Sequence, residues 1–354
     1  MIGFAVRQFR TQAVIAAVAV VAVAIAVLIV GPQVVHYYDS YVANCAKYSD
    51  CQITQANFEF KYNVLRLWLG VLVVVAPGLA GIFWGAPLVA RELETGTFRL
   101  AWTQSVMRTR WLASKLGLIA LASVAVVGLL SLLVTTWAST LDKVNQDLFG
   151  TFDSRGIVPL GYALFGVALG AASGAIVRRT LPAMVTTLAA FVAFRIVVTE
   201  WVRPHLMSPL RTSYPFQISM PGPGQSQGSV ALTPHIPANA WIVSQNIVNS
   251  AGKVVGTNGQ LGLNGNGAIN VGANGVTISN IGSCPNLKAP TGDVAFRAGS
   301  LVQQCVAQLR LREVTLYQPP SRYWPIQVEE TLIFVAAAVV LGAVSLWWVR
   351  RRLT

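Results

Sequence analysis

Six apolar runs, each close to the length of a membrane crossing, limit what this chain can fold into. A helix needs about 20 predominantly apolar residues to cross the hydrocarbon core of a bilayer. The runs lie at residues 13–30, 67–89, 116–137, 158–177, 181–201 and 331–349. Only 11% of the residues are charged, whereas about 25% is typical of soluble globular domains. The sequence therefore predicts an α-helical polytopic membrane protein with six transmembrane helices.

The basic residues near the ends of these runs fall on one side of a six-span topology. They are Arg7, Arg10, Arg91, Arg99, Arg108, Arg110, Lys115, Arg178, Arg179, Arg350, Arg351 and Arg352. Cytoplasmic loops carry an excess of Lys and Arg, so this side is expected to be cytoplasmic. We therefore expect a multi-pass protein of the bacterial plasma membrane with both termini in the cytoplasm. The formal net charge of +13 is attributed to these loops and not to nucleic-acid binding.

All four cysteines, Cys45, Cys51, Cys284 and Cys305, fall on the opposite side of this topology. Disulfides form and persist outside the cytoplasm. The simplest pairing is Cys45 with Cys51 and Cys284 with Cys305, although four cysteines allow three pairings. Four free thiols are the alternative.

The segment between the fifth and sixth runs is the longest polar part of the chain. We divide the chain into residues 1–201 with five helices and a polar cytoplasmic connector at 91–110, an extracytoplasmic domain at 202–328, and residues 329–354 with the sixth helix and a basic tail. Val, Ile and Asn-Gly steps in the extracytoplasmic segment predict short strands and tight turns. Helical spacing follows, at Phe296, Leu301, Cys305 and Leu309. This segment is therefore expected to be a small α+β domain, or an irregular Gly/Asn-rich segment.

Motifs of catalysis and of metal binding are missing from the sequence. It contains no G-x-x-x-x-G-K-[ST] loop, no H-E-x-x-H and no G-x-S-x-G. The three histidines, His36, His205 and His235, have no metal-ligand spacing. We expect no enzymatic activity, no catalytic residue and no bound metal or cofactor in this chain.

Glycines recur at four-residue steps inside two of the runs. Gly166, Gly170 and Gly174 share one face of the fourth run, and Gly81 and Gly85 lie in the second. Small residues at this spacing let membrane helices approach closely. We expect them to pack the bundle, with a role along a substrate path as the alternative.

Arg195 lies inside the fifth run. A charge within a membrane span is costly and is a functional hypothesis by default. Arg195 is therefore a candidate residue of a substrate path. The alternatives are that its side chain reaches outward to the interface or pairs with Glu200.

A polar, patterned connector joins the second and third runs. If the helix continued through it, Glu94, Phe98 and Trp102 would align at i, i+4 and i+8. Gly96 would permit a bend or a break. Glu92 and Glu94 would be repelled by anionic lipid, so these acids favour docking into a basic groove of a protein partner.

This connector resembles the cytoplasmic connector of ABC-2 type transporter permeases. The matching positions are Glu92 or Glu94, Gly96, Thr97, Leu100, Trp102, Arg108, Lys115 and Leu116. The stretch before the sixth run resembles the start of the last helix in a subset of these permeases. Its matching positions are Tyr317, Gln318, Pro319, Arg322, Trp324, Gln327, Glu330 and Thr331.

The resemblance implies a permease subunit of an ATP-binding-cassette exporter. Such subunits form homodimers or heterodimers in the bilayer, and each binds a cytoplasmic ABC ATPase subunit that carries ATP and Mg²⁺. The connector would act as a coupling helix on that partner, through Glu92, Glu94, Gly96, Thr97, Phe98, Arg99, Trp102 and Arg108. The candidate substrate path would include Arg195, Gln327 and Glu330.

Two other functional classes remain as alternatives. The first is a membrane-anchored sensor or assembly scaffold with a functional ectodomain. The second is a secondary transporter, which typically places its substrate and coupling-ion sites near the bilayer midplane. No Asp or Glu lies near the centre of a predicted span.

Overall fold

The computed structural model divides into two compact units. A helical unit comprises Met1–Met207 and Arg322–Thr354, and a sheet unit comprises Ser208–Ser321. The structure describes residues 2–44, 51–96, 108–145, 147–216, 236–257, 260–261, 269–272, 275–278, 282–287, 301 and 303–352.

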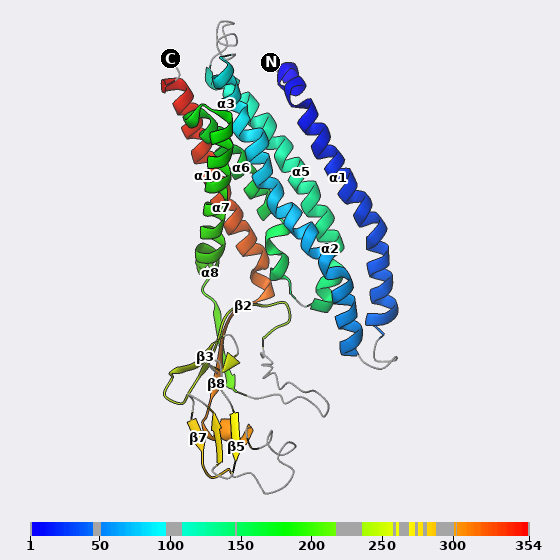
Figure 1. Cartoon of the computed structure of the whole chain (residues 1–354), viewed down its shortest axis with the longest axis vertical. Helices are drawn as coiled ribbons and strands as arrows, with labels where there is room; N and C mark the ends of the chain where they lie inside the picture. The colour runs from blue at the N-terminus through cyan, green and yellow to red at the C-terminus, as the bar shows by residue number, and fades with distance from the viewer. Residues whose placement is uncertain are drawn as a thin grey trace. The chain divides into compact units, whose positions relative to one another are not determined.

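Helices, most of them long, make up the helical unit (Figure 1). Their bounds are α1 Ile2–Tyr37, α2 Cys51–Ala80, α3 Ala86–Thr95, α5 Arg108–Asn145, α6 Val158–Val177, α7 Thr180–Val197, α8 Arg203–Leu206 and α10 Tyr323–Arg352. Short π or 3-10 turns adjoin them, namely η1 Tyr38–Val42, η3 Gly81–Gly85, η4 Phe149–Ser154, η5 Val198–Val202 and η6 Pro320–Arg322. Among the described residues, six helices are long and apolar enough to cross a membrane. This confirms the prediction from the six apolar runs.

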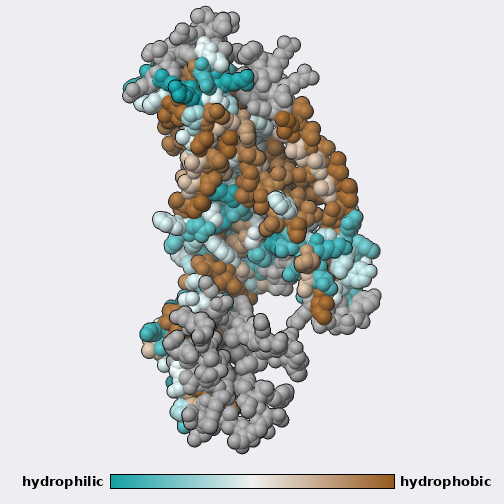
Figure 2. All heavy atoms as spheres, viewed as in Figure 1, coloured by the Kyte–Doolittle hydropathy of each residue, from teal (hydrophilic) through white to brown (hydrophobic). Residues whose placement is uncertain are grey.

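Helices α1, α5 and α10 continue beyond the apolar runs that predicted them, whereas α6 has the same bounds as its run. Apolar residues gather along the middle of the helices, and polar residues gather toward their ends (Figure 2). Many large apolar side chains of these helices are exposed, including Leu28, Leu121 and Leu181. Exposed apolar side chains at this density are stable facing lipid and not water. Both chain termini lie at the same end of the helical unit (Figure 1).

Helix α6 is the central helix of the unit, because it contacts α2, α3, α5, α7 and α10. Its glycines lie directly against another backbone. A Cβ added at Gly170 would lie 2.2 Å from the carbonyl oxygen of Gly81, and one at Gly174 would lie 2.5 Å from that of Ala86. The glycine steps therefore pack α6 against η3 and α3, as their spacing predicts.

The sheet unit is built from antiparallel strands. They are β1 Leu210–Pro215, β2 Trp241–Val248, β3 Val254–Thr257, β4 Gln260–Leu261, β5 Ile269–Gly272, β6 Gly275–Ile278, β7 Gly282–Cys284 and β8 Arg312–Gln318. One sheet has the order β1-β8-β2-β3-β4 and the other β5-β6-β7. Strand β8 pairs Val314 with Ser213 on one side and with Asn246 on the other.

A disulfide joins Cys284 to Cys305, as the simplest pairing predicts. Both cysteines belong to a buried core with Phe216, Ile247 and Val276. The bridge spans 21 residues, and closing a loop of this size stabilises a fold by about 3 kcal/mol in the chain-entropy model. Cys51 is also disulfide-bonded, and its expected partner, Cys45, lies outside the described residues, as does Phe296.

The close approach of α6 to η3 leads to a prediction. Gly170→Ala should lower the free energy of unfolding by about 1–3 kcal/mol, because the new methyl group meets backbone atoms that cannot rotate away. Gly117→Ala in α5 is the matched control, since a Cβ there meets no atom within 4 Å. Unfolding of the detergent-solubilised protein, followed by circular dichroism, measures both. Equal stability of the two variants would show that α6 has room for a side chain at position 170.

Candidate functional site

Two acidic residues at the C-terminal end of α3, Glu92 and Glu94, bind residues of two other helices. Glu92 is buried, 8% exposed, and its carboxylate forms an ion pair with the ammonium group of Lys115 in α5. That ammonium also lies 4.6 Å from the centre of the Trp111 ring. Because an unpaired buried charge is costly, this pair fixes the end of α3 to the start of α5.

Glu94 connects the same end of α3 to α7. One carboxylate oxygen accepts hydrogen bonds from the backbone N–H of Thr180, at 3.0 Å, and from its hydroxyl, at 2.7 Å. Thr180 is the first residue of α7. The carboxylate therefore satisfies a backbone N–H that has no partner within that helix, and its charge is favourable at a helix N-terminus.

Helix α3 ends at Thr95, because Gly96 adopts a left-handed conformation with φ of +72°. Glycine is the usual residue at this position after a helix. Helix α3 therefore breaks at Gly96, as the sequence permitted, and the continuous helix that would align Glu94 with Phe98 and Trp102 does not pass this residue. Thr97, Phe98, Arg99 and Trp102 lie outside the described residues. Arg108 begins α5, and its side chain also lies outside them.

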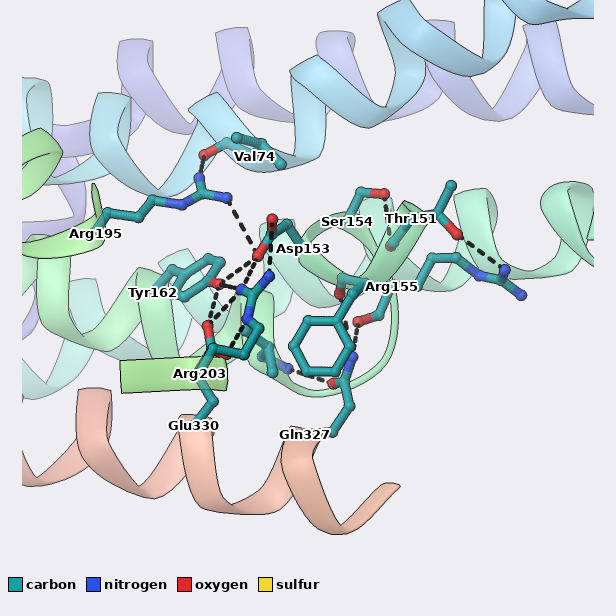
Figure 3. A network of polar contacts seen from close by, with 12 residues as sticks. Val74, Thr151, Asp153, Ser154, Arg155, Tyr162, Arg195, Arg203, Gln327 and Glu330 are labelled. Carbon is teal, nitrogen blue, oxygen red and sulfur yellow. Dashed lines mark hydrogen bonds and ion pairs between the residues drawn. The ribbon is translucent and has the colours of Figure 1, made fainter. Parts of the chain in front are cut away.

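A second polar cluster, which we call the outer network, joins several helices (Figure 3). One of them, α8, lies at the end of the helical unit opposite the termini (Figure 1). The outer network consists of Asp153, Tyr162, Arg195, Arg203 and Glu330, from η4, α6, α7, α8 and α10. Arg203 binds both oxygens of the Glu330 carboxylate, at 2.6 and 2.8 Å. It also forms an ion pair with Asp153. The Tyr162 hydroxyl lies 2.8 Å from Asp153 and 2.6 Å from Glu330.

Arg195 completes the outer network from α7. Its guanidinium lies 3.6 Å from the Asp153 carboxylate and 4.5 Å from the centre of the Tyr162 ring. It donates a hydrogen bond of 3.1 Å to the carbonyl oxygen of Val74 in α2. Within the described residues Arg195 forms no ion pair with Glu200, so that expected alternative is wrong. Two guanidinium groups face two carboxylates, and the network is electrically balanced.

The π turn η5 brings Arg195 and Arg203 to the same side. In a regular α-helix, residues eight apart point about 80° away from each other. A π turn adds one residue to the turn, which reduces that angle to about 20°. Both arginines can therefore reach Asp153, although one belongs to α7 and the other to α8.

Burial alone raises the pKa of the Asp153 carboxyl. The Arg203 guanidinium, through its charge and its hydrogen bond, and then Arg195 outweigh this effect, so the pKa lies below its usual range. Asp153 is therefore ionised at neutral pH, and it acts as the shared anion of the two arginines.

Gln327 of α10 fastens the start of α6. Its carbonyl oxygen accepts hydrogen bonds from the backbone N–H groups of Ile157 and Val158, at 3.0 and 3.1 Å. Its amide nitrogen donates to the carbonyl oxygens of Phe152 and Arg155, both at 3.1 Å. One side chain thus makes hydrogen bonds with four backbone groups that would otherwise bond to water.

Of the three residues predicted to line a substrate path, Gln327 and Glu330 are fully buried and hydrogen-bonded inside the bundle. Arg195 lines an open groove between α2 and α7 with a volume of about 370 Å³. Sequence reasoning missed Asp153, Tyr162 and Arg203. Asp153 lies in a short connection between two helices, and Arg203 follows an apolar run. Neither position indicates a buried ion pair unless the tertiary contacts are known.

Within the described residues, no group of three His, Cys, Asp or Glu side chains could hold a metal ion. The two polar clusters consist of ion pairs and hydrogen bonds between helices. These contacts hold the helices in fixed positions relative to one another.

The outer network leads to a second prediction. Arg203→Met should lower the free energy of unfolding by about 3–5 kcal/mol, because it leaves the buried Glu330 carboxylate without its cation. Adding Glu330→Gln should recover part of that loss, since a neutral amide is less costly to bury than a carboxylate. Glu329→Gln, at the neighbouring position in α10, is the control. Urea unfolding in detergent would contradict the account if Arg203→Met were as stable as Glu329→Gln.

Comparison with known proteins gives one family. The family model described as ABC-2 membrane transporter related matches residues 16–203, which is more than half of the chain. The matched segment contains α2, α3, α5, α6 and α7, and it ends at Arg203. No match was found to a curated protein or to a solved structure. The chain belongs to the ABC-2 membrane transporter related family.

Proposed function

We propose that this chain is the permease subunit of an ATP-binding-cassette exporter, which forms the substrate path and is driven by a separate cytoplasmic ATPase subunit. Membership of the ABC-2 membrane transporter related family supports this proposal. The observation that carries it is the fastening of the end of α3 to α5, α6 and α7.

A coupling segment must transmit force from a partner to the spans that move. Helix α3 contacts α6 through Ala86, whose backbone lies against Gly174. Glu92 binds Lys115 in α5, and Glu94 binds Thr180 in α7. A push on the connector after Gly96 would therefore act on three spans at once. The contacts that would transmit this force from α3 to α5, α6 and α7 are already present in the structure.

This arrangement changes the role that we assign to the two acids. Both were predicted to dock into a basic groove of the partner. Because Glu92 and Glu94 already have partners within the chain, we now assign them to positioning the connector. Contact with the ATPase then falls to connector residues such as Phe98, Arg99 and Trp102, together with Arg108, which remains a prediction.

The orientation follows from charge. Arg91 lies in α3, Arg110 at the start of α5, Arg179 directly before α7 and Arg350 near the end of α10. Helix α3 and the last turns of α10 lie at the same end of the helical unit as the N-terminus (Figure 1). By the positive-inside rule, this side faces the cytoplasm, where an ATPase would meet the connector. ATP and Mg²⁺ would bind to that ATPase and not to this chain. We further propose that the permease works as a dimer, with itself or with a homologue.

The proposal is tested at Trp102. Trp102→Ala should weaken association with the ATPase subunit at least tenfold, which needs only about 1.4 kcal/mol. Tryptophans at the centre of an interface commonly contribute more than that. Co-purification of the tagged chain with co-expressed ATPase subunits, followed by titration of the purified components, measures the affinity.

Trp201→Ala is the matched control. Trp201 is 74% exposed and lies in η5, far along the chain from the connector. It should bind the ATPase like the parent. If Trp102→Ala also binds like the parent, the connector does not dock on the ATPase through this side chain and the coupling proposal is wrong.

A further inference from the structure

The groove between α2 and α7 has apolar walls that are exposed. Leu79 from α2 and Leu188, Val192 and Ile196 from α7 line it, and each is between 43% and 57% exposed. The floor includes Phe191, which is 4% exposed and packs against Gly78. A volume of about 370 Å³ accommodates the apolar body of a small organic molecule.

One end of this groove is polar. Asp153, Arg195, Thr199 and Glu200 lie there. The hydroxyl of Thr199 is buried and has no hydrogen-bond partner among the described residues. A buried polar atom without a partner is unusual in a protein, and a ligand is one of its ordinary causes.

The same end carries an unbalanced negative charge. Asp153 and Glu330 are balanced by Arg195 and Arg203 within the outer network. Glu200 forms no ion pair within the described part of the chain. The polar end of the groove therefore has one net negative charge, beside an apolar channel. Glu200 is exposed, and a carboxylate without a paired cation attracts a positively charged group.

We infer that this groove binds amphiphilic organic cations, with the apolar body between α2 and α7 and the single positive charge at Glu200. This inference rests on the proposed transport function, for which it names the substrate class. A lipophilic anion would meet the Glu200 carboxylate and be repelled.

The test uses two ions of the same shape and opposite charge, tetraphenylphosphonium and tetraphenylborate. Equilibrium dialysis against the full chain in phosphatidylcholine nanodiscs measures binding, after subtraction of uptake by empty nanodiscs. We expect saturable binding of the cation and no saturable binding of the anion. Glu200→Gln should weaken cation binding at least fivefold, and Leu79→Trp, which fills the groove, should abolish it. Glu329→Gln removes a carboxylate from α10 outside the groove and should change the affinity by less than twofold.

Several results would overturn the inference. They are the absence of saturable cation binding, saturable binding of the anion, or equal effects of Glu200→Gln and Glu329→Gln. Cation binding that persists in Leu79→Trp would place the ligand elsewhere, and lipid alone would then occupy the groove. The assay uses this chain without an ATPase. If the chain binds the ATPase but shows no saturable cation binding, the substrate class is rejected and the proposed function stands. If the chain binds the cation but does not associate with the ATPase, the proposed function is rejected and the binding site stands.

Discussion

Helix α6 occupies the middle of the helical unit because glycine lets two other segments come into backbone contact with it. A Cβ at Gly166 would lie 2.6 Å from the carbonyl oxygen of Pro77, and a Cβ at Gly170 would overlap η3. Backbones this close have no space for rearranged side chains, so α2, η3, α3 and α6 are held in one register. The positions of α5, α7 and α10 depend on this contact, since each of them packs against α6.

Polar contacts then fix the two ends of the unit around this glycine interface. At the end with the termini, Glu92 and Glu94 fasten α3 to α5 and α7. At the opposite end, Arg203 and Gln327 fasten α8, η4 and the start of α6 to α10. The buried charges in these sets, Glu92, Lys115, Arg203 and Glu330, are paired, which is the condition under which buried charges are tolerated. Glu94 is exposed. In the proposed permease, a displacement at the connector would reach the groove between α2 and α7 through helices that are tied at both ends.

The sequence predicted the elements of this fold better than their contacts. Hydrophobic length predicted the six helices, and glycine spacing predicted how α6 packs, because both are local patterns. The Cys284–Cys305 bridge could be predicted because the chain has only four cysteines, which allow few pairings. The partner of Arg195 could not be predicted, because Asp153 is distant in the chain and because a π turn, which has no clear sequence signal, sets the direction of Arg203. The acids of α3 were assigned to a partner protein because the sequence does not show that Lys115 and Thr180 lie within their reach.

The central claim is that the end of α3 transmits force to α7 through Glu94 and Thr180, and a double-mutant cycle tests it most directly. The rate of ATP hydrolysis by the co-purified ATPase, with and without this chain, is measured for Glu94→Ala, Thr180→Val and the double variant. The account predicts that all three still bind the ATPase, that each single change lowers the stimulation of hydrolysis, and that the double variant is no worse than Glu94→Ala. Stimulation equal to the parent in Glu94→Ala, or effects that add in the double variant, would contradict it.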